Sequence, residues 1–170
     1  MKKALLPVMA LSLLFAVTSV MAAPATKTQF TTKASFVPGN ISIGEVWITK
    51  DGIRHVKGAT SFTFVTGDIS GTMWLVSSET IDLNTGEGTN HGEFVLTVNS
   101  GTFEGSFQGE FSPQSPGQLA ISGTFVGQGS GIYDRQMIMA SSKGRLILPG
   151  PGPPVVEIVL EGTILSPNGQ

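Results

Sequence analysis

Hydrophobic and polar residues alternate along most of this chain, and the alternation is clearest between Gly101 and Gly131. From Phe103 to Phe111, phenylalanine and glycine take turns on one face, while glutamate, serine and glutamine occupy the other. A period of two predicts a half-buried β-strand. Because the face expected to be buried alternates a large ring with no side chain, we expect a tightly curled sheet, as in a small barrel.

The same period of two recurs along the rest of the chain. The expected hairpin partner of the strand at 103–111 is the segment 118–128, which also mixes large residues with glycine on one face. Further strands are predicted at 34–37, 43–48, 54–57, 61–66, 72–78, 93–99, 132–140, 144–148 and 156–164, with a stiff proline-rich loop at 149–154. The 22 Gly and 10 Pro oppose helices, and no later segment has apolar residues at helical spacing for three turns. We therefore predict one all-β domain, an antiparallel barrel of about eight strands, with a β-sandwich as the alternative.

The first residues have the pattern of a signal peptide. Lys2 and Lys3 form a basic start, an apolar run follows over residues 4–20, and small residues end at Ala22. This order predicts export, cleavage after Ala22, and a secreted or periplasmic protein. Residues 1–22 would then be the signal peptide and residues 23–170 the single barrel domain. An N-terminal membrane anchor is the alternative, which the short apolar core and the small-residue site disfavour.

Composition narrows the chemistry that the chain can perform. It has no cysteine, so thiolate metal sites, thiol catalysis and disulfides are all excluded. Its formal net charge is −2, only 13% of residues are charged, and no basic stripe is present, so nucleic-acid binding is not expected. After the signal peptide, no apolar run is long enough to span a bilayer as a helix. We predict no cofactor.

One segment resembles a calcium-binding loop. Asp82, Asn84, Asn90 and Glu93 fall at the first, third, ninth and twelfth places of such a loop. The fifth place offers no ligand, the sixth is not glycine, and no helices flank the segment. The alternative, which we favour, is a polar hairpin connection between two strands, with no metal bound.

Aromatic residues are the main candidates for contact with a ligand. Phe62, Phe64, Phe103, Phe107 and Phe125 are predicted to line an apolar interior by the alternation of their strands.

Tyr133 follows the glycine-rich segment beside a charge pair, at the predicted rim of the barrel. There it could orient a ligand or simply begin a strand. Trp47 and Trp74 oppose the main apolar pattern of their strands, so they fill space beside the barrel or form a contact surface in an oligomer.

Residues 129–164 resemble the C-terminal part of the allene oxide cyclase-like barrel, a fold that the dirigent proteins share. The resemblance rests on three segments: Gly-Ser-Gly-Ile-Tyr-Asp at 129–134, Gly-Arg-Leu at 144–146, and Leu-Glu-Gly-Thr-Ile at 160–164. It implies an eight-stranded antiparallel barrel with an apolar cavity, often trimeric. It carries over no catalytic residue, because residues 30–58 do not match the family's catalytic region and its cavity cysteine has no counterpart here. The chain looks most like small secreted prokaryotic members with no assigned activity.

Together these features predict an exported, non-enzymatic barrel that binds an apolar or amphipathic small molecule, or a partner protein. Two alternatives stay open. One is a cyclase- or isomerase-type enzyme that acts on a lipid-like substrate. The other is a structural, oligomeric secreted protein whose barrel is filled by its own side chains, as small barrels can be.

Overall fold

The computed structural model describes residues 25–147 and 155–167. The predicted signal peptide and the proline-rich loop at 149–154 lie outside these residues. Within the described ranges, no helix is long and apolar enough to cross a membrane. The strands are β1 (Thr26–Ser42), β2 (Glu45–Ile48), β3 (Ile53–Gly67), β4 (Gly71–Asp82), β5 (Gly88–Val98), β6 (Gly101–Ser115), β7 (Gln118–Gly131), β8 (Met137–Ile147) and β9 (Val155–Ser166).

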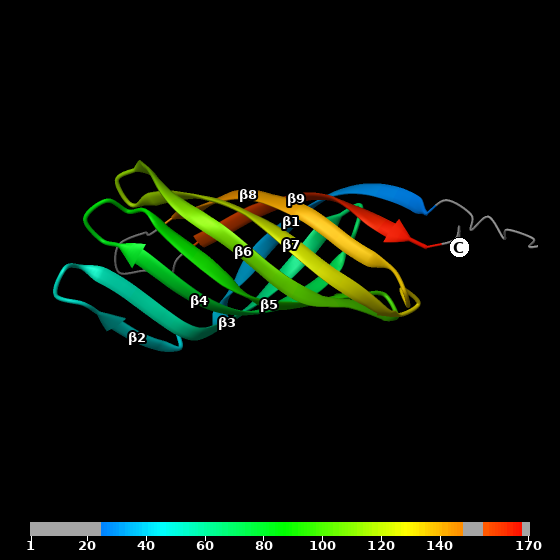
Figure 1. Ribbon diagram of the computed structural model, residues 1–170, viewed down its shortest axis with the longest axis horizontal. Coiled ribbons are helices and arrows are strands. Elements are labelled where there is room, and N and C mark those ends of the chain that lie inside the picture. The colour runs from blue at the N-terminus through cyan, green and yellow to red at the C-terminus, as the bar shows by residue number, and fades with distance from the viewer. Residues whose placement is uncertain (1–24, 148–154, 168–170) are drawn as a thin grey trace, which may run out of the picture.

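Eight of these strands form a closed ring of antiparallel neighbours (Figure 1). The order around the ring is β1-β9-β8-β7-β6-β5-β4-β3, and β1 closes it by pairing with β3. Thr32 of β1, for example, is the partner of Leu160 on one side and of Gly67 on the other. The short strand β2 adds to the edge of β3 beyond the end of β1. The prediction of a single all-β antiparallel barrel is confirmed, and the sandwich alternative is not what the chain forms.

The alternation of phenylalanine and glycine has a direct structural meaning in the β6–β7 ladder. Gly105 pairs with Gly127 and Gly109 with Gly123, while Phe107 pairs with Phe125 between them. A Cβ atom on Gly127 would stand 2.8 Å from Cζ of Phe94, so this glycine leaves room for that ring. The rings of Phe94 and Phe107 pack on Phe125 with centroids 5.3 and 5.2 Å apart. Glycine thus lets aromatic rings from neighbouring strands fill a narrow barrel.

The interior of the barrel is divided along its length. The end with the β5–β6 and β7–β8 turns is filled by a large buried cluster centred on Phe103, Met73 and Leu96, and we call it the packed end. The opposite end has the β2–β3, β4–β5 and β6–β7 turns and lies on the left in Figure 1. There a small cluster of Ile81, Phe111 and Ile121 lines the wall without filling the space, and we call it the hollow end.

The glycine-rich segment that carries the family resemblance covers the packed end. Gly131 has a φ of +67°, which lets the chain reverse after β7. The turn returns Tyr133 onto Phe103, with ring centroids 4.7 Å apart. Cβ atoms on Gly101 or Gly129 would stand 2.5 and 2.7 Å from atoms of Tyr133, so both glycines make room for this residue. Tyr133 therefore caps the packed end.

The placement of Phe62 and Phe64 inside the barrel is wrong. Phe64 is 53% exposed, and both rings lie on the outer face of β3 beside Trp74. Their neighbours Thr63 and Val65 face inward, where the Thr63 hydroxyl donates a hydrogen bond to the Met73 carbonyl at 3.0 Å. Phe103 and Met73 already fill this level of the barrel, so only small side chains fit there.

A β-bulge contributes to the exchange of inner and outer faces along β3. The register between β3 and β4 shifts between Lys57 and Ala59, at Gly58, whose φ is +69°. One extra residue in a strand exchanges the inner and outer faces on its two sides. Even-numbered residues such as Arg54 and Val56 therefore face inward before the bulge, whereas odd-numbered residues face inward after it.

Candidate functional site

The hollow end contains a cavity of about 560 Å³. Drug-sized ligands occupy pockets of this size, which are mostly apolar with a few polar groups that orient the ligand. The floor is formed by Phe107 and Phe125, which separate the cavity from the packed end. Its apolar walls include Val56, Leu75, Ile81, Phe111, Ile121 and Ile158.

A row of inward-facing polar residues crosses the cavity wall. Glu79 of β4 pairs with Asn90 of β5, and Asn90 pairs with Gly109 of β6. Gly109 in turn pairs with Gly123 of β7, and Gly123 pairs with Ser142 of β8. The pair Gly109 and Gly123 is therefore flanked by polar side chains, whereas the pair Gly105 and Gly127 lies beside Phe94.

The glycines of this row leave room for the polar groups. A Cβ atom on Gly109 would stand 2.5 Å from Oδ1 of Asn90. One on Gly123 would stand 3.1 Å from Oγ of Ser142. The amide and the hydroxyl therefore approach the bare backbone of β6 and β7 on the inner side of the barrel.

Glu79 carries a carboxyl group in the cavity wall. Burial raises the pKa of Glu79 above its ordinary value of 4.5, because the surrounding protein solvates the ionised form poorly. The guanidinium of Arg54, on the adjacent strand β3, acts in the opposite direction with 3.7 Å between Nη1 and Oε2. Both side chains are partly buried and line the cavity, so the site combines apolar walls with one compensated charge pair.

The side chain of Asn90 differs from the other polar groups in the cavity. Its Oδ1 atom is buried, and no group of the described residues donates a hydrogen bond to it. An amide oxygen in a low-dielectric interior without a donor is unfavourable by about 1–3 kcal/mol. This oxygen lies against Gly109, where an added Cβ atom would stand 2.5 Å from it, and it has almost no accessible surface for a molecule in the cavity to contact.

The structure separates the six aromatic residues that we expected to line a cavity. Phe107 and Phe125 line it. Phe103 is 0% exposed within the packed end, and Tyr133 covers that end. Phe62 and Phe64 lie outside the barrel, as described above.

Residues 82–93 do not form a calcium-binding loop in the structure. The backbone N–H of Asn84 donates to the Asp82 carboxylate at 2.8 Å, and Gly86 N–H donates to the Asp82 carbonyl at 2.7 Å, which makes a compact turn. Asn90 and Glu93 belong to β5 and point to opposite faces of it, so the proposed ligands cannot surround one ion. Within the described residues, no group of three or more His, Asp or Glu side chains is placed to hold a metal ion.

Sequence reasoning missed Arg54, Glu79 and Ser142 as residues of the cavity. The strand predicted at 72–78 ends one residue before Glu79, whereas β4 continues to Asp82. Extending the period of two from Leu75 through Ser77 would have placed Glu79 on the inner face. A charged residue in phase with the apolar face of a strand was therefore the available signal.

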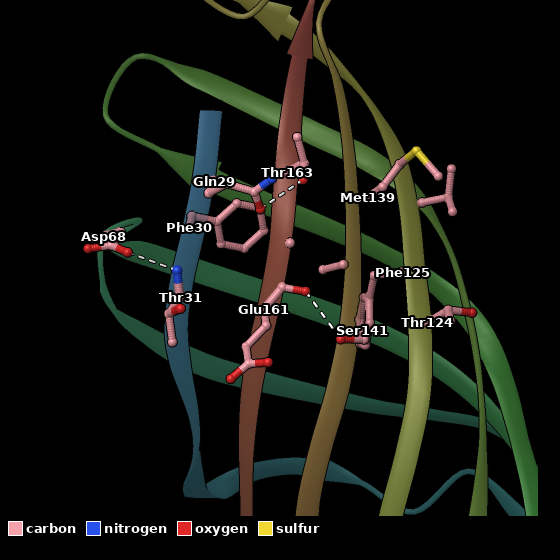
Figure 2. A pocket seen from close by; sticks show the side chains of 13 residues that line it. Gln29, Phe30, Thr31, Asp68, Thr124, Phe125, Met139, Ser141, Glu161 and Thr163 are labelled. Carbon is pink, nitrogen blue, oxygen red and sulfur yellow. Dashed lines mark hydrogen bonds between the residues drawn. The ribbon is translucent and has the colours of Figure 1, made fainter. Parts of the chain in front are cut away.

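A second hollow lies on the outer surface of β1, β9, β8 and β7 (Figure 2). It is shallow, and three hydrogen bonds join some of its polar groups to one another. Thr163 Oγ1 donates to Gln29 Oε1 at 3.1 Å, Ser141 Oγ donates to the Glu161 carbonyl at 3.3 Å, and Thr31 N–H donates to Asp68 at 2.8 Å. This hollow is open and several of its polar groups are already paired, whereas the internal cavity has mostly apolar walls, so we regard the internal cavity as the candidate site.

Relationships to other proteins add no further constraint on this site. Comparisons with protein-family models, with curated proteins and with solved structures found no match to the chain.

Proposed function

We propose that this protein is an exported, non-enzymatic barrel that binds an amphipathic small molecule inside its hollow end. The observation that carries this proposal is the cavity of about 560 Å³, whose apolar walls are crossed by a row of polar side chains. An apolar ligand body would contact the walls around Leu75, Ile81 and Phe107, and its polar end would meet Glu79, Asn90 or Ser142. Burial of apolar surface, at about 25 cal/mol per Å², would supply the affinity.

Export and family membership belong to the same proposal. The signal-peptide pattern at residues 1–22 supports a secreted or periplasmic location, and the segment at 129–134 supports kinship with the allene oxide cyclase-like barrels. A homotrimer is the assembly that this kinship suggests. The outward-facing Phe62, Phe64 and Trp74 support a contact surface on β3 and β4.

The binding proposal is tested with N-phenyl-1-naphthylamine, a neutral probe whose fluorescence rises in apolar sites. We expect the wild-type protein to bind it and Ser77→Phe to lose most of the signal, because Ser77 lines the cavity. Val76→Phe is the matched control, since Val76 precedes it on the outer face of β4 and is 38% exposed. Equal probe binding by both variants would contradict the proposal.

Native mass spectrometry of protein purified from its own export compartment complements the probe. We expect a copurified small molecule on the wild type that is absent from Ser77→Phe. The same spectra give the number of copies in the assembly. A ligand retained by Ser77→Phe would place binding elsewhere on the molecule.

A second candidate function is a cyclase- or isomerase-type enzyme that acts on a lipid-like substrate. The observation that favours it is the Glu79 carboxyl in the cavity wall, because burial raises its pKa above the ordinary value and so favours the protonated form, which can donate a proton. The copurified molecule would be incubated with wild type and with Glu79→Gln. Conversion to an isomer of the same mass by the wild type alone would establish the enzyme, and no conversion by either would leave the binding role.

A further inference from the structure

The floor of the cavity separates the hollow end from a close-packed core. Phe107 and Phe125 line the cavity and also belong to the buried cluster of the packed end. Their rings are stacked, with centroids 5.2 Å apart and an angle of 16° between the planes. Phe94, which packs edge-on against Phe125, and Phe103, which is 0% exposed, belong to the same cluster but do not line the cavity. A molecule in the cavity therefore cannot pass the two stacked rings without opening the packed end.

Residues from other strands complete this floor. Leu75 of β4 lines the cavity and is a buried member of the same cluster. Phe36 of β1 and Ile158 of β9 line the cavity and pack against the cluster. Strands from around the whole ring thus contribute to the floor. Because a close-packed interior has low compressibility, the floor acts as a fixed wall rather than a soft one.

The charged side chains of the cavity lie toward its other end. Arg54 is the second residue of β3, and Glu79 is three residues before the end of β4, so both are close to the turns of the hollow end. Both side chains are partly exposed, with 3.7 Å between Nη1 and Oε2. An amphipathic ligand is therefore favoured with its polar end toward this ion pair and its apolar end on the floor, because the reverse orientation would bury a polar group against aromatic rings.

We propose that Phe107 and Phe125 are specificity determinants that set the greatest length of the ligand's apolar body. This inference rests on the proposed binding function and narrows its ligands to amphiphiles whose apolar part fits between the mouth and the floor. Each methylene group up to that length is buried in the cavity and adds affinity. A longer chain presses on close-packed rings or pushes its polar end out of the mouth, so further methylene groups add little.

The test uses straight-chain primary alcohols from hexan-1-ol to tetradecan-1-ol. Each alcohol is used to displace N-phenyl-1-naphthylamine from the wild-type protein. We expect each added methylene group to strengthen competition about fourfold, which corresponds to about 0.8 kcal/mol, up to a limiting chain length. Beyond that length we expect competition to stop rising.

Two substitutions move the floor in opposite directions. Phe107→Leu replaces a ring with a shorter side chain and lowers the floor, so its limiting alcohol should be at least one carbon longer than that of the wild type. Leu75→Phe adds a ring and raises the floor, so its limiting alcohol should be at least one carbon shorter. Because one change enlarges the cavity and the other fills it, loss of folding in one variant leaves the other as the test.

Phe103→Leu is the matched control. Phe103 lies on the same face of β6, four residues before Phe107, but it is 0% exposed and does not line the cavity. Loss of its ring should lower the melting temperature, because it leaves a void in the packed end. It should not change the limiting chain length.

The outcomes separate this inference from the function on which it rests. If the probe does not bind to the wild type, or if no alcohol displaces it, the binding function fails. If competition rises steadily to the longest alcohol, or if the limit does not move in a folded floor variant, binding stands and the inference is overturned. A shift in Phe103→Leu as large as that in Phe107→Leu would also overturn it, because general loosening of the core would then explain the change.

Discussion

One glycine of the β6–β7 ladder provides a quantitative test of how closely these two strands approach each other. Gly105 occupies an inward position opposite Gly127. A Cβ atom there would overlap the Val126 carbonyl oxygen and stand 2.8 Å from its carbon. These are backbone atoms of the paired strand, so no side-chain rotation relieves the contact, and β6 and β7 must separate.

The magnitude follows from two opposing effects. Forcing a methyl group into a close-packed site costs about 1–3 kcal/mol, occasionally more, and stretching ladder hydrogen bonds adds about 1 kcal/mol. Reduced freedom of the unfolded chain returns about 0.4–1 kcal/mol. We expect Gly105→Ala to lower the free energy of unfolding by about 2–3 kcal/mol, which is about 4–12 °C in melting temperature for a domain of this size.

Gly58→Ala is the control for this experiment. No heavy atom lies within 4 Å of its added Cβ, although its φ of +69° makes a side chain unfavourable by about 1 kcal/mol. Unfolding in urea, followed by circular dichroism, gives both free energies. If Gly105→Ala is no less stable than Gly58→Ala, the close approach of β6 and β7 is not what requires glycine there.

Two further predictions test the inside and outside of the barrel and its pH dependence. Phe103→Ala, at a fully buried position, should cost about 3–5 kcal/mol in urea unfolding, whereas Phe64→Ser on the outer face should cost less than about 1 kcal/mol; equal losses would contradict the assigned faces of β3 and β6. Because burial raises the pKa of Glu79 above 4.5, the folded protein binds more protons than the unfolded chain between 4.5 and the raised value. The stability of the wild type relative to Glu79→Gln should therefore fall as the pH rises through that window, measured by urea unfolding at a series of pH values, and a rise would refute this account.

Much of the fold was predictable because it depends on local alternation. The period of two in 103–111 and 118–128 predicted a hairpin, and the structure pairs these segments along β6 and β7. The position at which the alternation in β3 changes phase was harder to predict from the sequence. Gly58 introduces a bulge in β3, and because of it the residues on its two sides use opposite parity for the inner face.

The candidate site was harder to predict because its residues depend on what fills the rest of the barrel. Thr63 faces inward because Phe103 and Met73 already occupy that level, and no local pattern reveals this. Asn90 attracted attention as a calcium ligand, but the tight turn at Asp82 shortens the loop and places it in β5. Sequence spacing alone carries no information on whether a polar residue ends in a turn or a strand.

The division of the barrel into a packed end and a hollow end has a consequence for its internal motions. Strands β4 to β8 each contribute residues to both ends, so local stability should vary along each strand rather than from one strand to the next. Amide hydrogens near Phe103 and Leu96 should exchange with solvent only through global unfolding, while those near Ile81 and Ile121 should exchange through smaller openings. A ligand that enters through the hollow end then requires only the less protected part of each strand to open, while the packed end keeps the ring of strands closed.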